Sequence, residues 1–144
     1  MQAIRSFLIV LFMAVASTAV AQQTISISEL VNTKWRVENN WISDYKEYTL
    51  TEIIWKRKDG SFFKYPYYLT DTPVTSHDKS AFDYSKVGKS KKGSYMVSIN
   101  EKMGIVYCSS IESFDKKKGV LVIKVVTQGL IGASGGIERY KLVK

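Results

Sequence analysis

The sequence predicts an all-β protein, namely an antiparallel up-and-down β-barrel of seven or eight strands that follows an N-terminal signal peptide. Short runs rich in β-branched and aromatic residues recur along the chain, and such runs are typical of strands. Most of them are separated by brief segments rich in Gly, Asp and Lys, which is turn chemistry. Connections of hairpin length make consecutive strands neighbours, which favours a barrel over a sandwich, because sandwiches usually need longer crossovers between their sheets.

The chain after the signal peptide begins with a short helical or turn segment. Residues 26–31 contain Ser28 as a candidate helix cap. They lead into residues 34–38, Lys-Trp-Arg-Val-Glu, which are predicted to form the first strand.

A predicted hairpin follows. Residues 46–56 are rich in Tyr, Thr, Ile and Trp and are expected to form one strand. The pair Asp59-Gly60 is a strong hairpin turn signal and leads into the next strand, residues 61–69. Pro66 interrupts that strand, and since proline has no N–H to donate, it predicts an edge or a bulge there.

Residues 70–92 are polar, contain Pro73 and His77, and are predicted to be the long connection of the domain. Their apolar island, residues 81–84, is expected to dock onto the body of the protein, and would add an eighth strand if it paired. In the second half, residues 94–99 alternate with the period of a half-buried strand, and further strands follow turns at 100–104, 115–119 and 129–136. The seven predicted strands are residues 34–38, 46–56, 61–69, 94–99, 105–114, 120–126 and 137–143.

The N-terminus reads as a signal peptide. Arg5 is followed by a nearly uncharged apolar run over residues 6–19, and Ala19-Val20-Ala21 matches the pattern that signal peptidase accepts. The apolar core of about 14 residues is shorter than the ~20 that a transmembrane anchor needs. We therefore expect cleavage after Ala21, giving domains 1–21 (signal peptide) and 22–144 (barrel), and a periplasmic or secreted protein.

The mature chain of 123 residues is long enough for one domain with one core. The full chain carries a net charge of +8, and loss of Arg5 with the signal peptide leaves +7. A basic chain suits nucleic acid, anionic membranes or acidic ligands. Here, however, the lysines gather in the turn-like segments 56–58, 86–92 and 116–118, which are more typical of solvated loops.

Cys108 is the only cysteine, so the chain cannot form an intramolecular disulfide. Its neighbours are apolar or small, and no basic group nearby in the sequence would activate a thiolate. We expect a buried thiol that packs as a small hydrophobic group.

Three patterns imitate functional motifs. Residues 132–136 match G-x-S-x-G, but that motif needs a strand-turn-helix with an acid and a histidine after it, and His77 lies upstream. Residues 88–90 resemble the end of a phosphate-binding loop without the required earlier glycine. One histidine near carboxylates in a single polar loop falls short of a zinc pattern. We expect no enzyme, no metal and no cofactor. Paired carboxylates brought together by strands stay open, because spacing cannot test them.

The aromatic residues carry the functional hypothesis. Many lie in the first half of the chain. They either build the core or line a cavity in which hydroxyl and indole groups orient an apolar ligand.

The chain resembles the lipocalin-like proteins exported by Bacteroides and related bacteria. The resemblance rests on the signal peptide, on residues 29–35 leading into a first-strand Trp35, on residues 67–72 before a long loop, and on the last strand, 137–143. Thr33 replaces the glycine of the Gly-x-Trp motif of lipocalins. The resemblance implies a calycin-type barrel. It also suggests that Arg139 is the terminal arginine that packs over Trp35 as a cation–π pair.

Two functions follow from these observations. The first is a non-enzymatic binding protein that holds a small apolar or amphipathic ligand in the barrel, with basic loops that would favour an anionic head group. It is not embedded in a membrane and does not bind nucleic acid. The alternative is a filled barrel that acts through its surface as an interaction or inhibitor module of the cell envelope. The residues expected to bind the ligand are Trp35, Trp55, Tyr48, Tyr67, Tyr95, Tyr107 and Arg139.

Overall fold

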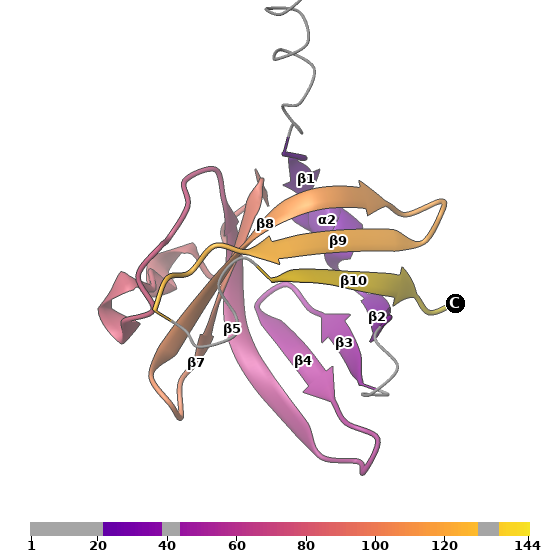
Figure 1. The fold of residues 1–144 in the computed structure, drawn as a ribbon, viewed down its shortest axis with the longest axis horizontal. Coiled ribbons are helices and arrows are strands. Elements are labelled where there is room, and N and C mark those ends of the chain that lie inside the picture. Colours follow the sequence, from indigo (N-terminus) through magenta and orange to yellow (C-terminus); the bar gives the residue numbers. More distant parts are fainter. Residues whose placement is uncertain (1–21, 39–43, 130–135) are drawn as a thin grey trace, which may run out of the picture.

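The computed structural model describes residues 22–38, 44–129 and 136–144. In this part of the chain, eight antiparallel strands form a closed barrel in the order β10-β2-β3-β4-β5-β7-β8-β9 (Figure 1). The predicted signal peptide with its cleavage point at Ala21, and residues 132–135 of the G-x-S-x-G string, lie outside the described residues. No helix among the described residues is both long enough and apolar enough to span a bilayer.

Each barrel strand pairs with the next strand in the sequence, so the fold is the predicted meander. The last strand closes the barrel by pairing with the first, with Tyr140 opposite Val37 and Leu142 opposite Trp35. The strands are β2 (Thr33–Val37), β3 (Tyr45–Tyr48), β4 (Glu52–Lys56), β5 (Phe62–Thr70), β7 (Tyr95–Asn100), β8 (Ile105–Asp115), β9 (Val120–Val125) and β10 (Ile137–Leu142).

The eighth strand arises where the sequence had predicted one continuous strand over residues 46–56. This segment is a hairpin of β3 and β4, and Thr49 builds its turn. The Thr49 N–H donates to the carbonyl of Glu52 at 2.9 Å, and its hydroxyl oxygen accepts from the N–H of Glu52 at 2.9 Å. The turn, Thr49-Leu50-Thr51, contains no Gly, Pro or Asn, so the usual turn signal is missing.

A short N-terminal segment packs into the barrel core. The two-residue strand β1 (Ile25–Ser26) pairs with β6 (Lys92–Gly93), and the one-turn helix α2 (Ile27–Leu30) follows it. The N-cap is Ser26 rather than Ser28, and its N–H donates to the Glu29 carboxylate at 2.9 Å. Leu30 is fully buried and belongs to the same core cluster as the barrel interior. The segment therefore fills one end of the barrel with apolar side chains.

The long connection packs against the outside of the barrel. Residues 81–84 do not add a barrel strand. They lie at two 3-10 turns, η1 (Lys79–Ala81) and η2 (Tyr84–Lys86), and Phe82 docks on Tyr68 with ring centroids 5.1 Å apart. Tyr68, Phe82 and Cys108 belong to a second core cluster on the outer face of β5, β7 and β8. The predicted docking of this island is confirmed, and its rings cover what would otherwise be an exposed apolar face of the sheet.

Pro66 lies within β5 at a local sheet edge, as predicted, because β5 has no partner on its β7 side at this residue. Residues 62–66 of β5 pair with β4, whereas the ladder between β5 and β7 begins at Tyr67 opposite Ser98. Pro66 therefore lies where β5 has a partner on one side only, which a residue without an N–H tolerates. Figure 1 shows the β4–β5 hairpin diverging from β7 below this point.

Candidate functional site

The candidate site is a cavity of about 270 Å³ in the barrel lumen. Because side chains alternate along a strand, every second residue points inward, and each strand except β2 contributes inward side chains to the wall. The lining residues are Lys46, Tyr48, Ile53, Trp55, Tyr65, Met96, Ser98, Tyr107, Ser109, Ile123, Val125 and Glu138.

Most of the lining side chains are aromatic or aliphatic, and the polar ones are Lys46, Ser98, Ser109 and Glu138. Below the cavity, Tyr48 packs edge-on against Tyr67 at 5.7 Å between ring centroids. The Tyr67 hydroxyl donates to the carbonyl of Thr49 at 2.7 Å, so its polar atom is satisfied within the barrel. Apolar side chains thus dominate the cavity, and the packed rings of Tyr48 and Tyr67 close it at one end; these rings are the packed floor of the cavity.

One polar cluster interrupts the apolar wall. Lys46 Nζ donates to the Tyr140 hydroxyl at 2.7 Å, and that hydroxyl donates to the Glu138 carboxylate. Lys46 Nζ also lies 3.7 Å from Glu138 Oε2. Because Glu138 and Tyr140 are two residues apart on β10, both side chains point to the same face.

Two aromatic rings flank the Lys46 ammonium. Its Nζ lies 4.7 Å from the ring centroid of Trp55 and 4.8 Å from that of Tyr140, a cation–π arrangement. Burial lowers the pKa of Lys46, and Glu138 partly offsets this effect. Burial also raises the pKa of Tyr140 well above its ordinary value. Removing water from the ammonium makes its remaining N–H groups strong donors toward a ligand.

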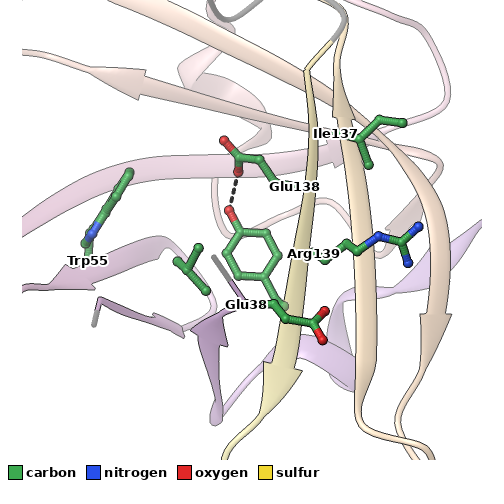
Figure 2. Close-up of a pocket in the computed structure, with 7 residues that line it drawn as sticks. Glu38, Trp55, Ile137, Glu138 and Arg139 are labelled. Carbon is green, nitrogen blue, oxygen red and sulfur yellow. Dashed lines mark hydrogen bonds between the residues drawn. The ribbon is translucent and has the colours of Figure 1, made fainter. Parts of the chain in front are cut away.

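Trp55 is held in place by a buried carboxylate. Its indole N–H donates to the Asp44 carboxylate at 2.6 Å, and Asp44 is itself buried. Trp55 and Glu138 also line a neighbouring surface pocket of about 430 Å³ with Glu38 and residues 137–140. Figure 2 shows Glu138 extending toward Trp55, whereas Ile137 and Arg139 extend from the opposite side of β10. The lumen and the surface pocket therefore share two side chains at the rim.

The structure brings three of the predicted ligand-binding residues to the cavity, Trp55, Tyr48 and Tyr107. Tyr67 points inward but belongs to the packed floor. Trp35 is fully buried in the core beneath, where it packs on Phe114 at 5.8 Å.

Tyr95 and Arg139 lie away from the cavity. Tyr95 packs against the outer cluster under the long connection. Arg139 is exposed on β10 and does not cover Trp35, so the predicted cation–π contact is not formed, because odd-numbered residues of β10 point out of the barrel. The residue opposite Trp35 in the ladder is Leu142.

The Thr33 hydroxyl links the Trp35 indole to the backbone of the short helix. The Trp35 indole N–H donates to the Thr33 hydroxyl oxygen at 2.8 Å, and that hydroxyl donates to the carbonyl of Leu30. Thr33 thus satisfies a buried indole and ties the short helix to β2.

Sequence reasoning missed Lys46 and Glu138. The alternation of side chains along a strand could have revealed them. Lys46 is two residues from Tyr48 and Glu138 is two residues from Tyr140, so each charged side chain points inward with the neighbouring tyrosine. A charged residue at an inward position is unusual enough to mark a site.

The remaining candidates do not form a site. His77 Nδ1 lies 3.0 Å from the carbonyl oxygen of Gln128, while Asp78 and Asp83 cap the two 3-10 turns. Among the described residues, His, Cys, Asp and Glu nowhere gather in a group of three that could hold a metal.

Comparison with protein-family models, with curated proteins and with solved structures found no match. The barrel and its cavity are therefore the features from which a function can be inferred.

Proposed function

We propose that the protein is an exported, non-enzymatic, lipocalin-like binding protein that holds one small, mostly apolar ligand in the barrel lumen. The observation that carries the proposal is the cavity of about 270 Å³, whose mostly aromatic and aliphatic wall carries its charged lining residues, Lys46 and Glu138, in one cluster. Binding sites for small molecules combine an apolar concave wall with a few placed polar groups. The volume lies just below the usual range of about 300–1,000 Å³, so the ligand is a small one.

The polar end of the ligand is a neutral oxygen that accepts a hydrogen bond from Lys46. The ammonium has three N–H donors and gives one to Tyr140. A ligand carboxylate would meet Glu138 and the nearby Asp44 as well as Lys46. Two negative groups against one positive group disfavour a further anion in a poorly hydrated site. An alcohol or carbonyl compound therefore fits better than the anionic head group that the basic composition had suggested.

The first experiment is native mass spectrometry of the protein purified from its own host, followed by extraction under denaturing conditions. A co-purifying small molecule of constant mass supports the proposal and identifies the ligand class. The same spectrum tests export, since signal-peptide cleavage after Ala21 predicts a mature chain beginning at Gln22.

A matched pair of probes tests the polar group. We expect 1-octanol to bind with saturation and octanoate to bind more weakly, followed through tryptophan fluorescence, with Trp55→Phe identifying the responding indole. Lys46→Met should weaken 1-octanol binding by about tenfold or more, the value of a hydrogen bond to a charged group. Lys34→Met is the control, because Lys34 lies on the outer face over Tyr45.

Each outcome has a definite meaning. Stronger binding of octanoate than of 1-octanol would overturn the assignment of the polar group. Ser98→Phe places a ring in the cavity and should abolish binding of both probes. A clean mass spectrum together with no saturable probe binding would contradict the binding function and favour the surface-acting module.

A further inference from the structure

The tip of the β4–β5 hairpin, residues 56–64, exposes two phenylalanines to solvent. Phe62 is 59% exposed and Phe63 is 39% exposed. Residues 62–66 pair with β4 alone, and Figure 1 shows this hairpin projecting away from β7. Large apolar side chains gathered at a projecting tip are unusual for a surface without a partner.

Basic side chains surround the two rings. The tip holds four basic residues and one acidic residue, a net charge of +3. The acidic residue, Asp59, is used by the turn itself, since its carboxylate accepts from the N–H and hydroxyl of Ser61 at 2.8 and 2.6 Å. Arg57 lies over the Phe63 ring at 4.8 Å, and Lys56 pairs with Glu47 at 3.0 Å. Lys58 and Lys64 are exposed and make no ion pair among the described residues.

We propose that the β4–β5 tip docks on the surface of an anionic lipid bilayer. Phenyl rings enter the boundary between head groups and acyl chains, and basic residues around them are attracted to anionic head groups. Protein–protein interfaces are depleted in lysine, whereas Lys56, Lys58 and Lys64 surround the two rings here. Single-stranded nucleic acid stacks on open aromatic platforms. Phe63 lies parallel to Tyr65, but Arg57 already covers the Phe63 ring, and Phe62 points to the opposite face of β5.

Docking at this tip would bring the cavity to the bilayer. Trp55 and Tyr65 belong to the same hairpin and line the lumen. The proposal does not depend on a ligand in the cavity, because the exposed rings and the basic residues lie outside it.

The test is co-sedimentation of the purified protein with vesicles. We expect binding to equimolar phosphatidylglycerol and phosphatidylcholine, little binding to phosphatidylcholine alone, and release as the salt concentration is raised. The triple variant R57Q/K58Q/K64Q should lower the partition coefficient by about a hundredfold, at roughly fivefold per basic residue. Phe62→Ala should lower it by several-fold.

Two matched controls distinguish an effect specific to the tip from an effect of net charge or of general hydrophobicity. K116Q/K117Q/K118Q removes the same charge from the β8–β9 turn, and Leu50→Ala removes a side chain that is 46% exposed in the β3–β4 turn. Both controls should bind like the wild type, and thermal unfolding should show that every variant is folded.

Equal losses in the two triple variants, or no binding to the anionic vesicles, would overturn the proposal. Tighter binding of single-stranded RNA than of vesicles, lost in R57Q/K58Q/K64Q, would also overturn it. Unchanged 1-octanol binding in the tip variants keeps this result separate from the cavity function.

Discussion

The buried tyrosines make the free energy of unfolding decrease as the pH rises in the alkaline range. Burial raises the pKa of Tyr48, Tyr67 and Tyr140 above the ordinary value of 10.0. Above that value the unfolded chain releases protons that the folded chain retains, so stability is complete below pH 10 and falls as the pH rises. Lys46 has the opposite sign, because its lowered pKa makes stability rise with pH up to 10.5.

We therefore expect the free energy of unfolding to fall between about pH 10.5, where the Lys46 contribution is complete, and about pH 11.5, by about 1.4 kcal/mol for each such tyrosine. Tyr48→Phe should reduce this fall by about 1.4 kcal/mol, because it removes one titrating hydroxyl. Urea unfolding at the two pH values measures both quantities. The same fall in the wild type and in Tyr48→Phe would show that Tyr48 does not contribute.

Cys108 should be inert in the folded protein. Its side chain is fully buried, its sulfur accepts from the N–H of Val74 at 3.4 Å, and burial raises the pKa of the thiol. Since the thiolate is the reactive species, a thiol reagent should label Cys108 slowly in native protein and rapidly in denaturant. Fast labelling of native protein would indicate that the outer connection opens readily.

At the scale of elements, the contact between β6 and β5 is too close for any side chain at Gly93. A Cβ at this position would lie 2.4 Å from the backbone nitrogen of Thr70. Gly93→Ala should therefore cost about 1–3 kcal/mol or more, because backbone must move. Gly60→Ala is the control: its site is open, and only its φ of +89° opposes the change, so we expect about 1 kcal/mol. Chemical denaturation measures the difference, and equal costs would argue against the tight approach of these strands.

The elements also show where sequence reasoning succeeded. Asp59-Gly60 predicted a turn, and Gly60 adopts a φ of +89° there. Turn chemistry is local, so it can be read from neighbouring residues. The β3–β4 turn was not predicted, because the Thr49 side chain forms it and the usual turn residues are absent.

For the molecule as a whole, closure depends on the last strand. β10 pairs with β2 on one side and β9 on the other, and it brings Glu138 and Tyr140 to Lys46. Deleting residues 137–144 should leave two unpaired edges and give an unfolded or aggregated protein. Deleting Lys144 alone should leave the fold intact. Circular dichroism and size-exclusion chromatography compare the two, and a monomeric, folded protein without β10 would contradict the importance of closure.

The residues alone were enough to predict the fold class and most strand positions, because alternation and turn chemistry act over a few neighbouring positions. They were not enough to identify the polar cluster or to exclude Tyr95 and Arg139 from the cavity. Lys46 and Tyr140 are 94 residues apart, and their contact exists only because the barrel closes in one register. A shift of one residue would turn every inward side chain outward. Register is set by the packing of all eight strands together, which is why the site appears only in the folded barrel.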